Sequence, residues 1–383
     1  MAKPRVLFVS HTGSISGAEL VLLDVVQPWA GASALLFENG PLAAALSAKG
    51  LKVTVSRWGQ GLAQMRRDSS ILKVIPLVGR LMAIAFETMA AARRHDVVYA
   101  NSQKAFVLSA LAVSLARRPL IWHLHDIISA AHFGRMQRRV QVTLANFCAT
   151  RVVVPSTACA DAFVAEGGKK ELVVVVPNGL DIAPEPRSPA QIRIDLQLPT
   201  GPLIGVFSRL AAWKGQHVVL QALAQTPGVS CIIAGEALFG EQAYAAKLHQ
   251  MVIDLALNDR VHFLGQRSDV PLLMRAVDAV VHPSIDPEPF GRTLVEAMLA
   301  GVSVIATDAG AASDILEAGR AGTLVPPDNA DALAAAIARI VSKPPELASQ
   351  LAYAEARAKS HYGTAQMLRA IDGVIEDAAG ART

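Results

Sequence analysis

The chain has 383 residues, 52% apolar and 18% charged, which is more than one hydrophobic core usually organises and leaves no segment polar enough to be disordered. Its three cysteines, Cys148, Cys159 and Cys231, are too widely spaced for a disulfide framework or a zinc site. Residues 1–195 carry 22 Lys and Arg against 13 Asp and Glu, whereas the remainder carries 14 against 19, so we expect the basic first half to face an anionic partner.

The N-terminus begins directly with a buried strand, predicted at residues 5–10, without the apolar core of a signal peptide, so a cytoplasmic location is expected. The next residues, HTGSISGAE at 11–19, form a strand-to-helix loop suited to contact with an anion or an acceptor. They match neither G-x-G-x-x-G nor G-x-S-x-G, which removes the main support for a dehydrogenase or a hydrolase. Short apolar runs then alternate with helical stretches, which predicts a doubly wound α/β domain.

Residues 65–94 combine clustered cations with large apolar side chains. Charges at Lys73, Arg80 and Glu87 interrupt the segment too often for it to span a bilayer. Such a composition suits a surface that rests on anionic lipid, so we expect peripheral association with the inner face of the cytoplasmic membrane. The basic run RMQRR at 135–139 is expected to extend this face or to contact an acidic acceptor.

A proline-rich segment near residues 182–198 is predicted to link two domains. The second half of the chain repeats the alternation of strands and helices. We therefore expect two Rossmann-like, doubly wound parallel-sheet domains that face one another across a cleft. The predicted boundaries are 1–190 and 191–365, with 366–383 as a C-terminal helix that crosses back to the first domain.

Two cations follow the first predicted strand of the second half, in FSRLAAWKGQ. Arg209 follows the strand end, and Lys214 stands five positions later, directly before Gly215 and the start of a predicted helix. Cations beside the free N–H groups of a helix N-terminus make a site for a diphosphate. The next predicted strand ends in IIAGEA, where Gly235 marks another turn from strand to helix.

The stretch HPSIDPEPFGRTLVEAM, residues 282–298, places Glu288 and Glu296 eight positions apart. We expect a helix to begin at Gly291 or Arg292, with its first amides turned toward an anion or a sugar hydroxyl. Glu296 then lies about one and a half turns into the helix, where its carboxylate can accept two hydrogen bonds from a vicinal diol such as ribose. Glu288, in the loop, can reach the other end of the same ligand.

These motifs resemble the signature of glycosyltransferase family 4, the retaining GT-B enzymes that use nucleotide sugars. The resemblance covers most of the chain, from SGAE near the start through HLHD and VVPNGLD to RVHFLGQ and AGTLVPPDN. It implies an α/β GT-B fold with an acceptor-binding first domain and a nucleotide-sugar-binding second domain. The implied enzyme is a hexosyltransferase that moves a sugar from a UDP- or GDP-sugar, such as GDP-mannose, to a glycan or lipid-linked acceptor in cell-surface polysaccharide or glycolipid biosynthesis.

The resemblance also implies roles for single residues. Arg209 and Lys214 would bind the donor diphosphate. Glu296 would bind the ribose hydroxyls, and Glu288 the transferred sugar. Further donor contacts are implied for Gly17, Gly235, Phe290, Gly291, Arg292 and Thr293.

The run WHLHD places His123 and His125 on the same face of one predicted strand. The family pattern selects His125 as the catalytic contact to a hydroxyl of the donor sugar near the reacting carbon, with His123 as the runner-up. Ser16 stands where many family members have a glycine, so a backbone contact is expected at Gly17 rather than at position 16.

No D-x-D motif occurs, so we expect metal independence and no cofactor besides the nucleotide-sugar co-substrate. Two alternatives stay open. A nucleotide-sugar 2-epimerase of the same fold would need additional acid and base carboxylates. A non-catalytic protein that binds nucleotide sugars or nucleic acid is favoured by the basic isoelectric point, about 9.0, but the chain lacks a basic motif interleaved with aromatic residues, so no nucleic-acid partner is expected.

Overall fold

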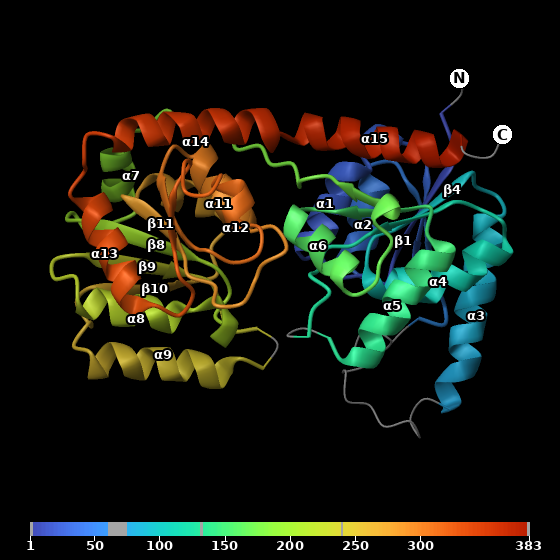
Figure 1. Ribbon diagram of the computed structural model, residues 1–383, viewed down its shortest axis with the longest axis horizontal. Helices are drawn as coiled ribbons and strands as arrows, with labels where there is room; N and C mark the ends of the chain where they lie inside the picture. Colours follow the sequence, from blue (N-terminus) through green and yellow to red (C-terminus); the bar gives the residue numbers. More distant parts are fainter. Residues whose placement is uncertain (1–2, 60–74, 131–132, 239, 381–383) are drawn as a thin grey trace. The chain divides into compact units, whose positions relative to one another are not determined.

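The computed structural model describes residues 3–59, 75–130, 133–238 and 240–380, which form two compact units (Figure 1). The first unit comprises residues 1–179 and 364–383, and the second comprises Leu180–Gly363. The division follows Gly179 rather than residue 190, because Leu180 N donates a hydrogen bond to Tyr362 O over 2.7 Å and the Leu180 side chain packs in the core of the second unit.

The first unit is built on a seven-stranded parallel sheet with the strand order β3-β2-β1-β4-β5-β6-β7. Its strands are β1 (Val6–Ser10), β2 (Ser33–Leu36), β3 (Lys52–Val55), β4 (Val97–Ala100), β5 (Leu120–His123), β6 (Arg151–Val154) and β7 (Val173–Val175). Every residue of β1 is buried, as expected for an interior strand of a parallel sheet that is covered on both faces.

Helices cover both faces of this sheet. One face packs against α3 (Ile75–Ala92), α4 (Gln103–Leu115), α5 (Arg135–Cys148) and α6 (Thr157–Ala165). The other packs against α1 (Gly17–Val25), α2 (Pro41–Ala48) and α15 (Thr364–Gly380), which returns from the end of the chain, while η1 (Gln27–Trp29) and η3 (Lys170–Leu172) are short 3₁₀ turns. Stacked rings of Trp122 and Phe106, with centroids 4.2 Å apart, fix α4 on β5.

The second unit repeats this plan with a six-stranded parallel sheet in the order β10-β9-β8-β11-β12-β13. Its strands are β8 (Leu203–Phe207), β9 (Ser230–Ala234), β10 (Val261–Gly265), β11 (Ala279–His282), β12 (Ser303–Thr307) and β13 (Thr323–Val325). In both units the first strand lies between the second and a later one, so the strand order reverses beside β1 and beside β8. Ligands of such sheets bind at this reversal, beyond the carboxyl ends of the strands.

The helices of the second unit also form two layers. One layer contains α8 (Gln216–Ala224), α9 (Gln242–Asp254) and α13 (Ala330–Val341), and the other contains α10 (Val270–Arg275), α11 (Arg292–Leu299) and α14 (Leu347–His361). The shorter elements are α7 (Pro189–Asp195), η4 (Ala212–Lys214) and α12 (Ala312–Ile315). These two doubly wound parallel sheets confirm the predicted α/β fold class.

The described helices include none whose length and apolar character would let it cross a membrane. The cysteines at positions 148, 159 and 231 are all free thiols. Of the segment 65–94, for which we predict lipid contact, residues 65–74 lie outside the described part of the chain.

Candidate functional site

Four polar side chains meet where β8 and β11 end, at the strand reversal of the second unit. Glu288 Oε1 accepts hydrogen bonds from Lys214 Nζ over 2.6 Å and from His282 Nε2 over 2.9 Å, and also from the hydroxyl of Ser284. His282 is the last residue of β11 and only 5% exposed. The structure thus brings together the predicted residues Lys214 and Glu288, which are 74 positions apart in the chain.

The surroundings of Glu288 keep its carboxyl group ionised. Burial acts to raise the pKa of Glu288, but the charges and hydrogen bonds of His282 and Lys214 outweigh it and hold the pKa well below its usual value. All three bonds end on Oε1, and no donor to Oε2 lies among the residues that the structure describes. The second carboxylate oxygen therefore remains for a ligand.

Close backbone contacts fix the loop that carries Glu288. The carbonyl of Glu288 accepts a bond from Ala311 N over 3.0 Å, and a Cβ at Gly310 would lie 2.3 Å from that carbonyl oxygen. A Cβ at Gly215 would lie 2.0 Å from Pro283 O, so the backbone beside Lys214 also touches this loop. Gly215 and Gly310 have φ values of +71° and +61°, in the left-handed region. Glycine adopts this conformation readily, and it has no Cβ that would clash with the neighbouring backbone.

The ring of Trp213 lies close to both predicted cations. Its ring lies 4.3 Å from Lys214 Nζ and 5.4 Å from Arg209 Cζ, measured to the ring centroid. Both distances lie within the range of cation–π attraction. The buried side chain of Gln216, the first residue of α8, donates bonds to Ser208 Oγ and to Arg209 O, both over 2.9 Å. The predicted arrangement of cations beside a helix N-terminus is therefore present.

Helix α11 begins at Arg292, as the sequence predicts, with Gly291 at its N-cap in the left-handed conformation, φ +76°. Phe290 is buried and packs edge to face against Tyr362, with ring centroids 5.8 Å apart, so it offers a ligand its backbone rather than its ring. Thr293 Oγ1 donates to Phe207 O over 3.3 Å and ties the first turn of α11 to the end of β8.

Glu296 lies one turn after Arg292 on α11, and Arg292 Nη2 is 3.7 Å from Glu296 Oε1. Burial raises the pKa of Glu296, and the Arg292 charge opposes this only in part. Arg292 Nη1 is buried without a partner in the described part of the chain. A carboxyl group and a guanidinium group thus lie next to each other in the first two turns of α11.

Gly235 directly follows β9, which lies beside β8. Its φ is +149°, and a Cβ there would lie 2.0 Å from Ser208 O. Gly235 N donates to Gly265 O over 2.8 Å, so the ends of three neighbouring strands come close at this glycine. Backbone packing explains the residue, and its contact with a nucleotide stays a prediction.

The predicted histidine of the first unit belongs to a chain of hydrogen bonds. His125 Nε2 is 3.1 Å from Asn101 Oδ1, and Asn101 Nδ2 donates to Ala18 O over 3.2 Å. Burial lowers the pKa of His125 to about 3, so the imidazole is neutral at pH 7. These hydrogen bonds lead to the start of α1, where a Cβ on Gly17 would meet no atom from elsewhere in the described residues within 4 Å. The predicted residues Gly17 and His125 are therefore linked through Asn101 and Ala18.

His123 lies beside His125, with ring centroids 3.8 Å apart. Its Nδ1 is 2.6 Å from the hydroxyl of Tyr99, while its Nε2 has no partner among the described residues. Burial, reinforced by His125, holds the pKa of His123 well below its usual value. His123 is buried, and His125 is the more accessible of the two.

Sequence reasoning missed three residues of the second-unit site, namely Trp213, His282 and Ser284. A signal for His282 is present, because a histidine at the end of an otherwise apolar strand is unusual in a buried parallel sheet. Spacing could not have identified its partner, since the bond to Glu288 depends on how the intervening loop folds back. The described residues contain no group of three or more His, Cys, Asp or Glu side chains that could hold a metal ion.

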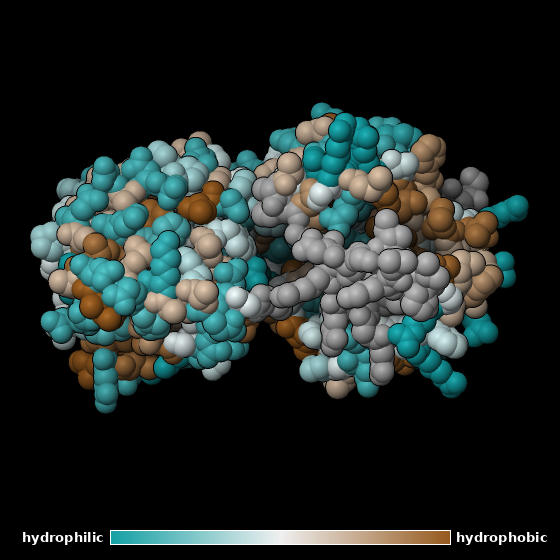
Figure 2. All heavy atoms as spheres, turned by 90° about the horizontal axis from the view of Figure 1, so that it is seen from below, coloured by the Kyte–Doolittle hydropathy of each residue, from teal (hydrophilic) through white to brown (hydrophobic). Residues whose placement is uncertain are grey.

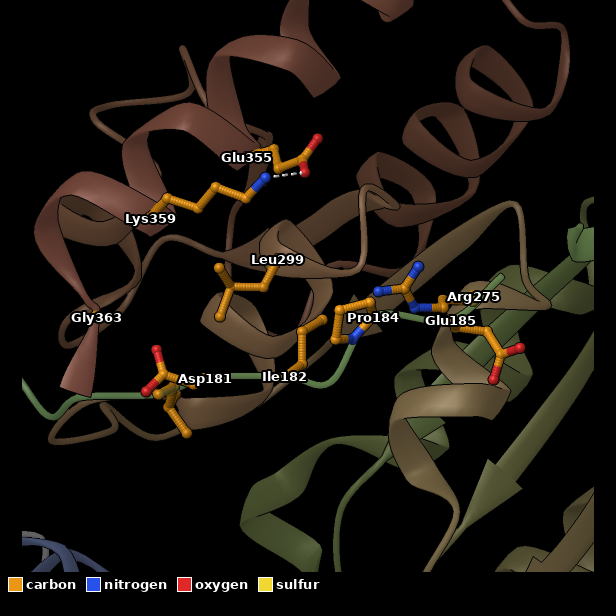
Figure 3. A pocket seen from close by; sticks show the side chains of 10 residues that line it. Asp181, Ile182, Pro184, Glu185, Arg275, Leu299, Glu355, Lys359 and Gly363 are labelled. Atoms are coloured by element: carbon orange, nitrogen blue, oxygen red, sulfur yellow. Dashed lines mark hydrogen bonds and ion pairs between the residues drawn. The ribbon is translucent and has the colours of Figure 1, made fainter. Parts of the chain in front are cut away.

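A separate cavity of about 400 Å³ lies within the second unit (Figure 3). It is lined by Leu180, Asp181, Ile182, Pro184, Glu185, Arg275, Leu299, Glu355, Lys359 and Gly363. Figure 3 shows the ion pair of Lys359 with Glu355, 2.6 Å long, at its rim. Leu299 is the last residue of α11, whereas Arg292 and Thr293 start that helix, so the cavity and the Glu288 site lie at opposite ends of α11.

Known proteins match both units. Residues 190–358 match the model of the group 1 glycosyl transferases, and residues 40–179 match the glycosyl transferase 4-like domain. The crystal structure of Anabaena Alr3699/HepE in complex with UDP is 38% identical, covers 97% of this chain and 100% of its own, and superposes with a TM-score of 0.86. The same protein in complex with UDP-glucose gives a TM-score of 0.84, with coverage of 98% and 100%.

Among curated relatives, the lipopolysaccharide core biosynthesis mannosyltransferase LpsB of Rhizobium meliloti is 31% identical over 56% of this chain and 65% of its own length. A phosphatidyl-myo-inositol mannosyltransferase of Mycolicibacterium smegmatis is 31% identical over 64% of this chain and 62% of its own. The chain thus spans less than two thirds of each of these curated relatives. The match to HepE, in contrast, extends over both units, and with the two family models it shows that the chain belongs to glycosyltransferase family 4, whose members have the GT-B fold.

Proposed function

We propose that the protein is a retaining, metal-independent glycosyltransferase that moves a hexose from a UDP-sugar to a glycan or a lipid-linked acceptor. The observation that carries this proposal is the cluster in which Lys214, His282 and Ser284 bond to Glu288. Arg209, which follows β8, lies near the ring of Trp213, as Lys214 does. It supplies cations for a diphosphate and an ionised carboxylate with one oxygen left for a sugar hydroxyl.

The donor would lie along the carboxyl ends of β8 and β11. Its diphosphate would be neutralised by Arg209 and Lys214 together with the first amides of α8 and α11. Glu288 Oε2 would accept a hydrogen bond from the transferred sugar. Glu296 would hold the ribose hydroxyls at the far end of the ligand.

Further contacts with the donor are proposed for the start of α11, for the end of β9 and for the first unit. Phe290, Gly291, Arg292 and Thr293 would offer backbone amides and, at Arg292, the unpartnered Nη1. Gly235 would line the nucleotide at the end of β9. From the first unit, we assign contacts with the donor to Gly17 and His125.

A UDP-sugar is preferred over a GDP-sugar because of the relatives. HepE, which is crystallised with UDP and with UDP-glucose, is 38% identical over nearly the whole chain. The two mannosyltransferases, which make GDP-mannose the second candidate donor, match at 31% over shorter regions. None of these relatives is an epimerase, so the 2-epimerase alternative gains no support from them.

In the proposed reaction the acceptor hydroxyl attacks the anomeric carbon from the side of the departing diphosphate. The bond from that carbon to the phosphate oxygen breaks as the new glycosidic bond forms, and the phosphate oxygen takes the proton of the hydroxyl. Lys214 and Arg209 would stabilise the negative charge that develops on the leaving diphosphate. The carboxylate of Glu288 would orient the sugar without forming a bond to it.

The acceptor is proposed from the relatives, which act in lipopolysaccharide core biosynthesis and on phosphatidyl-myo-inositol. A glycan or lipid-linked acceptor for cell-surface polysaccharide or glycolipid would be met at the inner face of the cytoplasmic membrane. We therefore propose a cytoplasmic enzyme that works at that surface.

The test combines binding and turnover. Thermal-shift measurements with UDP, GDP and ADP should show the largest rise in melting temperature with UDP. Hydrolysis of a panel of UDP- and GDP-hexoses, followed by NMR in the presence of EDTA, should release a hexose with the anomeric configuration of the donor. Inversion would refute the retaining mechanism, loss of turnover in EDTA would refute metal independence, and a C2-epimerised sugar would establish the epimerase instead.

A further inference from the structure

We propose that the outer faces of α3, α4 and α5 form one docking surface for an anionic lipid bilayer. We call this surface the three-helix face and define it by the exposed residues Val78, Met82, Phe86, Leu111, Leu115, Met136, Val140 and Phe147. This proposal extends the proposed function. It rests on that function in one respect, namely that a lipid-linked acceptor would be presented at the same membrane.

Helix α3 is apolar on two opposite sides. Its inner side places Ile84 in the core against the sheet. Val78, Met82 and Phe86 recur every four residues and are more than half exposed. At 100° per residue, Met82 and Phe86 lie nearly opposite Ile84. A helix that is apolar on both sides is usually covered on both, and within the described chain the outer side is open.

The neighbouring helices continue this stripe. Helix α4 packs against both α3 and α5, so the three lie in one layer over the sheet. On α4, Leu111 and Leu115 are exposed one turn apart. On α5, Met136 and Val140 are exposed one turn apart, and Phe147, near the end of the helix, is 84% exposed. Figure 2 shows brown, apolar atoms on the side of the first unit where Figure 1 draws α3 and α4.

The charged residues of α3, α4 and α5 indicate which kind of partner the three-helix face binds. The cations on these three helices are Arg80, Lys104, Arg135, Arg138 and Arg139, whereas the only acidic residue on them is Glu87. Of these cations, Arg138 is paired with Glu166, while Arg135 and Arg139 are exposed in the first turns of α5, beside Met136 and Val140. Exposed apolar side chains interleaved with arginines suit the boundary between anionic headgroups and acyl chains.

A protein partner or a second copy of this chain is less well matched. A second copy would bring the same cations face to face, and like charges across an interface oppose association. Long apolar side chains that point outward from three helices can each enter a lipid surface independently, without a complementary shape. The charge pattern and the outward stripes therefore both favour an anionic bilayer.

The experiment is sedimentation of the full-length protein with vesicles of phosphatidylcholine alone or of phosphatidylcholine with phosphatidylglycerol. Binding is expected only to the anionic vesicles, and it should weaken between 50 mM and 500 mM salt because headgroup attraction is screened. The double variant Phe86→Ser/Phe147→Ser should weaken vesicle binding at least about tenfold. The double variant Arg135→Gln/Arg139→Gln should weaken it about fivefold for each arginine, which corresponds to about 1 kcal/mol per charge.

Matched controls lie in the second unit. Ile194 and Ile253 are 69% and 59% exposed, and Ile194→Ser/Ile253→Ser should leave vesicle binding unchanged. Equal sedimentation with both kinds of vesicle, or equal binding by the Phe86→Ser/Phe147→Ser and control variants, would overturn the proposal. So would a lipid-free oligomer that Phe86→Ser/Phe147→Ser dissociates, because the face would then be a protein interface.

A thermal shift with UDP, measured on the same samples, separates this proposal from the proposed function. The three-helix face variants should keep the UDP response of the parent protein while losing the vesicles. A protein that binds anionic vesicles through this face but gives no response to UDP would sink the donor assignment and leave the docking surface intact.

Discussion

The two units share a sheet topology but hold their candidate ligand-binding groups in opposite electrical states. In the second unit, Glu288 is ionised and accepts hydrogen bonds from Lys214 and His282. In the first unit, burial keeps the imidazoles of His123 and His125 neutral. The contrast fits the proposed function, in which the second unit would neutralise the diphosphate of the donor and the first would meet uncharged hydroxyl groups.

The same contrast shows how each unit compensates for the hydration that its polar groups lose when the chain folds. A buried charge needs partners, and Glu288 has three donors on one oxygen. A neutral imidazole needs only a hydrogen bond, and His125 has one to Asn101. Variants that remove a charge from the second unit should therefore affect the reaction more than variants that remove a neutral group from the first.

The largest effect is expected for Lys214→Ala. The change removes both a cation that would stabilise the leaving diphosphate and a partner of Glu288, so kcat should fall about 100- to 1,000-fold, or about 3–4 kcal/mol. Steady-state turnover of the preferred UDP-sugar gives the measurement. Lys247→Ala on α9, an exposed lysine of the same unit, should retain parent activity. A Lys214→Ala variant with near-normal kcat would contradict the assignment.

A smaller loss is expected for His282→Ala, because His282 would act on the donor only through Glu288. We expect kcat to fall about tenfold, since Glu288 loses one of its charge-assisted hydrogen bonds. His282→Gln, which keeps an N–H donor, should recover part of the rate. If both variants lost the UDP thermal shift as well, His282 would support the fold of the site rather than the orientation of Glu288.

We expect a mildly acidic pH to lower the stability of the first unit more than that of the second. Burial lowers the pKa of His11 to about 4 and of His125 to about 3, and it lowers the pKa of His123. Their unfolded forms take up protons below about pH 6.5, so the first unit should lose stability as the pH falls from there. The pKa of Glu288 is lowered instead, so its contribution to the second unit is lost only below about pH 4.5.

Urea unfolding at pH 7.5 and 5.5, followed by tryptophan fluorescence, measures this difference. Trp29, Trp58 and Trp122 report on the first unit, and Trp213 reports on the second. His125→Gln should reduce the acid sensitivity of the first unit. His217→Gln is the matched control, because burial also lowers the pKa of His217 but in the second unit. Equal loss of stability in both units at pH 5.5 would contradict the prediction that the first unit is the more sensitive to acid.

Much of this contrast could be predicted from the sequence, and the reasons differ between residues. Alternating apolar runs predict the two parallel sheets, and Gly291 with the helix formers after it predicts the start of α11. Helix periodicity likewise predicts that Arg292 and Glu296 share one face. These features are local, so short stretches of sequence determine them.

The features that the sequence could not predict depend on contacts between distant segments. His282 meets Glu288 because the loop between them is held by Ala311 and by η4, through the bond from Ile285 N to Trp213 O. The boundary after Gly179 follows from the bond of Leu180 to Tyr362, far along the chain. The spacing of residues in the sequence does not predict either of these contacts. For the same reason, the exposed apolar stripes on α3, α4 and α5 form one surface only when the helices pack side by side.

The smallest effect is expected for Gly17→Ala, and it tests whether the first unit approaches the donor at all. A Cβ on Gly17 meets no atom from other parts of the described chain within 4 Å, and alanine favours the first turn of α1, so stability should be unchanged or slightly higher. If a ligand's charged group lies against this backbone, the added methyl group should raise KM for the donor about two- to fivefold with little change in kcat. Gly373→Ala, on α15, is equally free of contacts and should change neither constant. Identical constants for both variants would mean that the donor is held by the second unit alone, and the neutral groups of the first unit would then serve the acceptor.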